Sequence, residues 1–172
     1  MHTLKIISLI LLLTVYCDNA IAADRPTRFD KPEDVVAWLY RDFGWQAYVG
    51  QYFDEIVNDQ PKNILQRYFT PQLAALIMKE RKFEIETQQV GPANFDLLFG
   101  SQDPDGISNI RINRQPGTNI VSVLYDQNTI RDVMKIDFQV VKTQNGWRIS
   151  NIHYQQAGSF AVWLLDVLSG PY

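Results

Sequence analysis

Cysteine and histidine are scarce in this chain of 172 residues, which contains one cysteine, Cys17, and two histidines, His2 and His153. A structural zinc site needs about four Cys or His ligands, and a Ser-His-Asp triad needs a histidine beside its nucleophile. The sequence contains no Gly-x-Ser-x-Gly motif that would present such a serine. It therefore predicts no metal site and no cofactor, and it favours a binding protein over an enzyme.

An excess of positive charge is also absent. The chain has 16 Lys and Arg against 19 Asp and Glu, a formal net charge of −3, and the basic residues form no stripe. Nucleic-acid-binding domains usually carry a basic patch, so we do not expect nucleic acid as a partner. A hydrophobic content of 46% with 12% aromatic residues is typical of a folded domain rather than a disordered chain.

The longest apolar run is too short to span a bilayer, which requires about 20 apolar residues. It extends from Ile6 to Val15, follows Lys5, and precedes the small-x-small pattern Ala20-Ile21-Ala22. This order is typical of a secretory signal peptide. We expect a signal peptide over residues 1–22, a single domain over residues 23–172, a periplasmic or secreted location, and no integral membrane span.

Cys17 offers an alternative fate for this leader, because bacterial lipoproteins are cleaved just before a lipid-modified cysteine. The cleaving enzyme requires a small residue upstream, and the bulky Tyr16 stands there. Ordinary cleavage near Ala22 is therefore favoured over a lipid anchor at Cys17.

The first half of the mature chain predicts helices. One helix begins at Pro32, ends before Gly44 and carries apolar residues at helical spacing. A short helical piece covers Ile64–Phe69, and Thr70 is a good N-cap for a helix from Pro71 to about Glu86. The charged residues of that helix, namely Lys79, Glu80, Arg81, Lys82 and Glu84, are interpreted as mostly a solvated surface. The segment Trp45–Val57 stays open between an aromatic loop and a helix.

The second half changes to alternating apolar and polar residues, which predicts strands. In the third strand, Met134, Ile136, Phe138 and Val140 share one face; in the fourth, Ile149 and Ile152 fall on opposite faces. Asn145-Gly146 predicts a type I′ hairpin turn. Ser159 can cap a final helix from Phe160 to Leu168. The predicted strands are Ile107–Ile112, Asn119–Tyr125, Val133–Thr143 and Trp147–Tyr154.

Helices followed by strands predict an α+β fold. We expect N-terminal helices packed on a curved, cone-like antiparallel sheet of about four strands, with a short C-terminal helix. The hollow between a curved sheet and its helices would be a natural binding site.

Three stretches carry a resemblance to a known family: Arg67-Tyr68-Phe69-Thr70-Pro71, Phe95 to Asp103, and the hairpin Asn145 to Ile152. Together they resemble the YbjP/YqhG-type bacterial envelope family within the nuclear transport factor 2-like (cystatin-like) superfamily. Asn151 stands where many members carry an acidic residue. The resemblance implies a fold and a compartment, but no chemistry, because the superfamily contains isomerases, dehydratases, immunity proteins and binding modules.

The segment Phe95–Gly106 places apolar residues among turn residues and contains the candidate ligand-binding residues Asp96, Phe99 and Asp103. It could be a lid with a carboxylate facing inward, or an ordered loop that plugs the open end of the core. The second interpretation is favoured. Asp103-Pro104-Asp105-Gly106 resembles a calcium loop, but Arg114 stands where the final glutamate would be needed. A tight turn explains these residues better.

Tyr125 and Asp137 complete the candidate ligand-binding residues. An inward Asp in a hydrophobic hollow can act as a general base beside a tyrosine. Strand alternation instead favours a position for Asp137, between Lys135 and Gln139, on a solvent face or in an interface. A polar position near a strand end is the favoured interpretation of His153.

The sequence thus favours a periplasmic binding module for an envelope protein or peptide, for example an immunity-like protein that neutralises an envelope-targeting toxin. Two alternatives stay open. The chain could bind or convert a small molecule in the hollow, with an Asp as general base, or it could form a structural homodimer.

Overall fold

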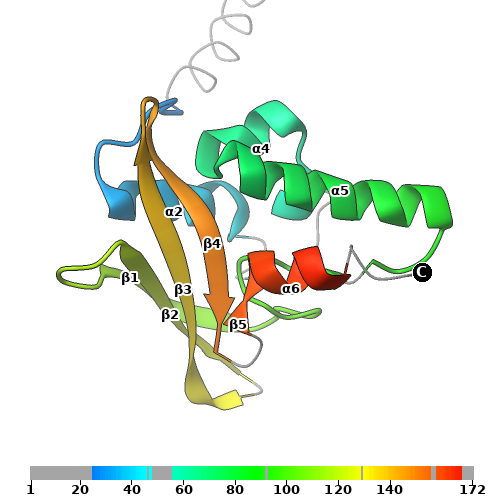
Figure 1. Ribbon diagram of the computed structural model, residues 1–172. Coiled ribbons are helices and arrows are strands. Elements are labelled where there is room, and N and C mark those ends of the chain that lie inside the picture. Colours follow the sequence, from blue (N-terminus) through cyan, green and yellow to red (C-terminus); the bar gives the residue numbers. More distant parts are fainter. Residues whose placement is uncertain are drawn as a thin grey trace, which may run out of the picture.

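A computed structural model describes residues 25–45, 47, 56–91, 93–128, 130–155 and 158–167. In it, N-terminal helices pack on a five-stranded antiparallel sheet, and a short helix follows the sheet (Figure 1). The predicted α+β class is confirmed. The predicted signal peptide, Cys17 and most of the Trp45–Val57 segment lie outside the described residues. Within the part described, no helix is both long and apolar enough for a membrane crossing.

The helices begin and end close to the predicted residues. The Thr70 side chain accepts a hydrogen bond from the Leu73 N–H over 3.3 Å, and Ser159 accepts one from the Val162 N–H over 3.3 Å, so both predicted caps are confirmed. Gly44 follows the first helix directly. The helical elements are α2 (Pro32–Phe43), the short 3₁₀ helix η1 (Val57–Asp59), α4 (Lys62–Tyr68), α5 (Pro71–Thr87) and α6 (Phe160–Val167).

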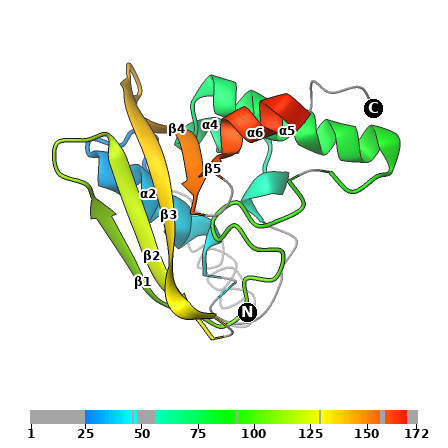
Figure 2. The same cartoon turned by 60° about the horizontal axis from the view of Figure 1, so that its bottom comes forward.

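The sheet has the strand order β1-β2-β3-β4-β5, with every neighbouring pair antiparallel. Four of its strands were predicted; the fifth contains two residues and pairs with the end of the fourth. The sheet curves strongly, and α2 lies against its concave side (Figure 2). The strands are β1 (Ile107–Arg114), β2 (Ile120–Gln127), β3 (Ile130–Thr143), β4 (Gly146–Tyr154) and β5 (Gly158–Ser159).

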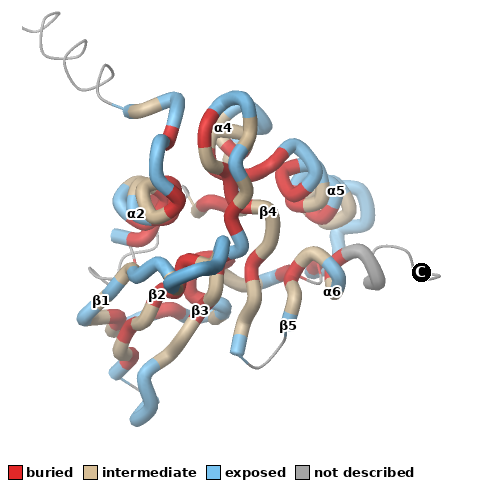
Figure 3. Tube along the Cα trace, turned by 60° about the vertical axis from the view of Figure 1, so that its left-hand side comes forward, coloured by how far each residue is buried: buried red, intermediate tan, exposed pale blue. Residues whose placement is uncertain are grey.

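The core lies between this concave face and the helices. Buried positions recur along β2, β3 and β4 and on the inward sides of α2, α4 and α5, whereas the C-terminal end of α5 is exposed (Figure 3). Ile136, Phe138 and Val140 are buried on the core side of β3, as predicted. The fold therefore depends on one apolar layer between the sheet and the helices.

The β3–β4 turn differs from the prediction. Thr143 pairs with Gly146, so that Gln144 and Asn145 form the loop. A type I′ turn centred on Asn145-Gly146 needs positive φ at both residues, but here only Gly146 has it, at +92°. The predicted type I′ turn is therefore wrong. A Cβ at Gly146 would also lie 2.6 Å from the Phe29 carbonyl oxygen, so this close approach favours glycine.

Strand β4 contains an irregularity that simple alternation did not predict. Gln139 pairs with Asn151, but the next residue, Val140, pairs with Ile149. This one-residue shift is a β-bulge. As a result Ile149 and Ile152, predicted on opposite faces, are both fully buried beside core residues of β3.

Candidate functional site

The hollow on the concave face of the sheet is filled by protein. Leu97, Leu98 and Phe99, here called the plug, have exposed fractions of 0–2%. The Phe99 ring makes edge-to-face contacts with Tyr40, at 5.5 Å between ring centroids, and with Tyr125, at 5.3 Å. The structure thus places the predicted site residue Phe99 in the core, where its edge-to-face contacts add to the burial energy.

Three tyrosines from three different elements hold the main chain of the plug. Tyr125 donates its hydroxyl to the Phe99 carbonyl over 2.6 Å, and Tyr154 donates to the Leu97 carbonyl over 2.9 Å. Tyr40 donates to the Leu98 carbonyl. Burial raises the pKa of Tyr125 to about 12, so its hydroxyl stays protonated at neutral pH. The sequence singled out Tyr125 as a candidate ligand-binding residue and missed the role that it shares with Tyr40 and Tyr154 in holding the plug.

A small apolar pocket of about 150 Å³ remains beside the plug. Phe95, Phe99, Met134 and Tyr154 contribute to its walls. Its volume is well below that of common ligand pockets, which begin at about 300 Å³.

Asp96 directly precedes the plug and is partly buried. One carboxylate oxygen accepts a hydrogen bond from the Leu98 N–H over 2.7 Å. Burial raises the pKa of Asp96 to about 6, against the opposing effect of main-chain hydrogen bonds from Leu98 and Phe99. The Asp96 carboxylate is therefore held in its charged form at an energetic cost at neutral pH.

Asp96 lines a larger cavity of about 390 Å³, the acidic pocket, which lies between η1, α5 and the 93–102 segment. Of the described residues that line it, four carry a carboxylate and one, Arg81, is cationic. Arg81 lies 3.7 Å from Asp59, an ion-pair distance. Among the residues described, Glu80, Glu84 and Asp96 form no ion pair. The pocket is lined by Ile56, Asn58, Asp59, Glu80, Arg81, Glu84, Ala93, Asn94, Phe95, Asp96 and Gln102.

The two glutamates of the acidic pocket are fixed by the turn that follows α5. Glu80 accepts a hydrogen bond from the Ala93 N–H over 3.2 Å, and Glu84 accepts one from the Gly91 N–H over 2.9 Å. A Cβ at Gly91 would lie 2.1 Å from a Glu80 carboxylate oxygen, so a larger residue here would displace that carboxylate.

Glu80 is only 4% exposed, and the prediction that it belongs to a solvated surface is therefore wrong. Burial, and secondarily the neighbouring Glu84, raises the pKa of Glu80. The sequence did contain a usable indication. Glu80 follows Leu73 and Ile77 at intervals that place all three on one stripe of α5.

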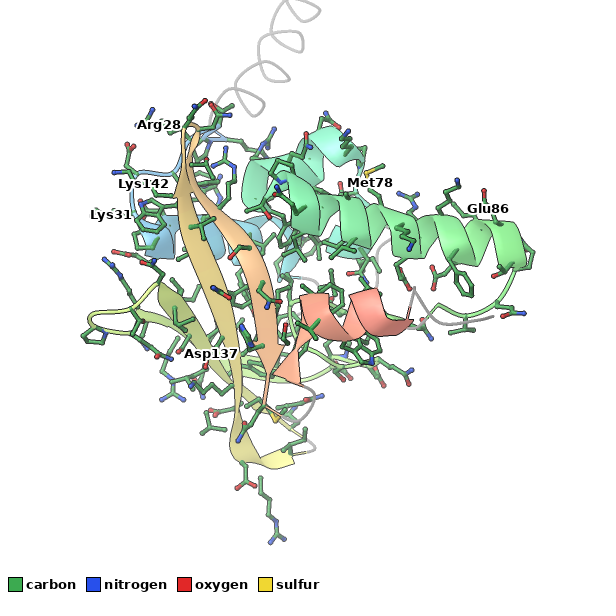
Figure 4. The ribbon with its side chains drawn as sticks, in the orientation of Figure 1. Arg28, Lys31, Met78, Glu86, Asp137 and Lys142 are labelled. Atoms are coloured by element: carbon green, nitrogen blue, oxygen red, sulfur yellow. The ribbon has the colours of Figure 1, made fainter. Side chains whose placement is uncertain are left out.

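Asp137, labelled on β3 in Figure 4, alternates with the buried Ile136 and Phe138 and therefore lies on the face of the sheet opposite the core. It accepts a hydrogen bond from Ser122 over 2.6 Å and pairs with Lys135 at 2.8 Å. In the sheet register it stands opposite His153. Asp137 and Tyr125 are therefore not brought together.

Asp103 is exposed and precedes the turn at Asp105-Gly106, where Gly106 has a φ of +65°. Its main-chain carbonyl accepts a hydrogen bond from the Gln127 side chain over 3.2 Å. Asp103 does not line the acidic pocket, although Gln102 does. Of the five predicted site residues, only Asp96 reaches this cavity.

In the described ranges, no three His, Cys, Asp or Glu side chains are grouped so that they could hold a metal ion. In the acidic pocket, Glu80, Glu84 and Asp96 each accept a hydrogen bond from a main-chain N–H, whereas Asp59 pairs with Arg81. Comparison of the chain with protein-family models, curated proteins and solved structures found no match. The family resemblance therefore stays a prediction.

Proposed function

We propose that the protein is an exported binding module that captures a protein or peptide partner through a basic side chain seated in the acidic pocket. Export rests on the predicted signal peptide. The observation that carries the binding role is the excess of carboxylates over cations around one cavity of about 390 Å³. An immunity-like protein that neutralises an envelope-targeting toxin would use such a site.

The electrostatics of the pocket favour a cation. Glu80 and Asp96 have raised pKa values because burial disfavours their charged forms. An arginine or lysine entering the pocket would supply the missing positive charge and form charge-assisted hydrogen bonds. Carboxylates kept partly desolvated without a counter-charge are a common property of functional sites.

The enzyme alternative has less support from the geometry. A tyrosine that assists an Asp general base needs its hydroxyl within reach of the substrate. The hydroxyls of Tyr40, Tyr125 and Tyr154 instead donate to carbonyl oxygens of the plug. The homodimer alternative would be recognised by a mass about twice that of the monomer in light scattering.

The test uses a hexa-arginine peptide as the probe and a hexa-glutamate peptide as its counterpart. We expect the arginine peptide to bind in calorimetry at low ionic strength, and affinity to fall at least fivefold in Glu84→Gln. Gln keeps the acceptor for Gly91 and removes only the charge.

Glu86→Gln is the matched control, because Glu86 is an exposed residue of the same helix outside the pocket. It should leave affinity within twofold of wild type. Equal loss in the two variants, or equal binding of both peptides, would show that only the overall charge of the protein matters and would refute the proposal.

A further inference from the structure

A second pocket lies at the N-terminal end of α5, and we propose that it binds an oxyanion of the carboxylate or phosphate type. Its volume is about 350 Å³. The inference is independent of the acidic pocket, which involves the C-terminal half of the same helix. The second cavity, here called the Arg148 pocket, is lined by Gln66, Phe69, Pro71, Thr143, Gln144, Asn145 and Arg148.

The central feature is a buried guanidinium without a counter-charge. Arg148 is 6% exposed and donates to three main-chain carbonyls, those of Gln66 at 3.1 Å, Thr27 at 3.0 Å and Trp147 at 2.8 Å. Carbonyls satisfy N–H groups but do not neutralise the charge. Within the described part of the chain, Arg148 forms no ion pair with a carboxylate. A buried charge without its opposite is costly, so the pocket favours an anion.

The Arg148 pocket can also supply directional contacts. A guanidinium has five N–H donors, of which three are used in these bonds; the other two have no acceptor among the described residues and could bind a ligand. The amide side chains of Gln66, Gln144 and Asn145 add neutral donors around the same cavity. Donors of both kinds match the several lone pairs of a carboxylate or phosphate.

Exposed cations gather at this end of the molecule. Arg28, Lys31 and Lys142 lie near the β3–β4 hairpin, whereas Glu86 lies at the far end of α5 (Figure 4). Arg28 is partly neutralised by Asp30, at 3.1 Å. The remaining positive potential would concentrate anions at the mouth of the pocket.

The first test titrates inorganic phosphate, and separately acetate, into the protein, with chloride holding the ionic strength constant. NMR follows the Arg Nε–H signals and the side-chain amides. We expect saturable shifts of Arg148 and Gln144 with one oxyanion or with both, and the more effective anion identifies the ligand class. Shifts no larger than those caused by chloride alone would overturn the inference.

Variants then locate the site. Arg148→Gln removes bonds to the distant Thr27 and Gln66 and to the adjacent Trp147, and would risk unfolding the protein, so Gln144→Glu is the better choice. It places a carboxylate at the rim and leaves the three carbonyl bonds in place. Asn119→Asp, at an exposed position after the β1–β2 turn, is the matched control. We expect phosphate or acetate binding to weaken at least tenfold in Q144E and less than twofold in N119D. Wild-type affinity in Q144E would overturn the assignment to this pocket.

Discussion

The hydroxyl of Tyr125 lies 2.6 Å from the carbonyl oxygen of Phe99, and the rings of the same two residues meet edge to face at 5.3 Å. One residue pair thus joins strand β2 to the plug through both polar and apolar contacts. Because this carbonyl is buried, its hydrogen bond has no ready replacement in water. The contact links the stability of the sheet to the position of the plug.

Tyr125→Phe should destabilise the protein by about 1–3 kcal/mol, because the ring stays while a buried carbonyl loses its donor. Urea denaturation followed by circular dichroism measures this change. Tyr154→Phe, which removes the corresponding bond to Leu97, should give a loss of similar size. A free energy of unfolding unchanged by either substitution would mean that water replaces the hydroxyl and that the plug is not held by these bonds.

Leu98→Ala tests whether the plug is a permanent part of the core. Leu98 is fully buried, so the substitution should cost about 2–5 kcal/mol through lost burial and a residual cavity. Val162→Ala is the control, because Val162 is 67% exposed and its loss should cost less than about 0.5 kcal/mol. If both variants unfold at the same denaturant concentration, the segment behaves as a lid that opens readily.

Asp96→Asn should stabilise the protein at neutral pH by up to about 3 kcal/mol, because the charged carboxylate is partly buried and asparagine keeps an acceptor for the Leu98 N–H. The folded-state pKa of about 6 is higher than the unfolded value of 3.8. The contribution of Asp96 is therefore most favourable below pH 4 and is lost as the pH rises through 6.

Unfolding free energies of wild type and D96N between pH 4 and pH 8 measure this difference. The two curves should converge at the acidic end and separate as the pH rises. A constant difference across the whole range would show that Asp96 titrates normally and that asparagine acts through packing.

Gly91→Ala should destabilise the turn after α5 by about 1–3 kcal/mol, because its methyl group would overlap a Glu80 carboxylate oxygen. It should also weaken hexa-arginine binding by displacing the carboxylate. Thermal unfolding and calorimetry give the two readouts. Adding Glu80→Ala removes the overlap with Glu80 but leaves Glu84 Cγ and Oε1 at 2.7 Å from the new Cβ, so the double variant should recover only part of the stability. If it recovers none, the Glu80 contact is not the cause.

Local residue patterns predicted the positions of most elements. Pro32 and Gly44 bracket α2, and Thr70 caps α5, because these effects act within one helical turn. The predictions were wrong where contacts with residues distant in the sequence determine the structure. The bulge in β4 puts Ile149 and Ile152 on one face, and Glu80 is buried by a turn that lies 11 to 13 residues beyond it.

The candidate site was likewise predicted from local sequence only in part. Asp96 and Phe99 were singled out because their segment mixes apolar and turn residues, and Asp96 does line the acidic pocket. Nothing in the local sequence could bring Asp96 to Glu84 across the end of α5, or Arg148 to the carbonyls of Thr27 and Gln66, which lie 121 and 82 residues away.

The sequence by itself determined the α+β class, the caps and most of the strands, because helix and strand periodicity, proline and glycine act over a few neighbouring residues. Tertiary structure decided that the hollow is filled, that the tyrosine hydroxyls bind the carbonyls of the plug, and that Arg148 lines a different pocket from Glu80, Glu84 and Asp96. Those outcomes depend on burial and on contacts between distant segments. Burial and these contacts exist only once the sheet has curved around its core. The desolvation of a side chain and its distance from other charges are therefore properties of the packed molecule.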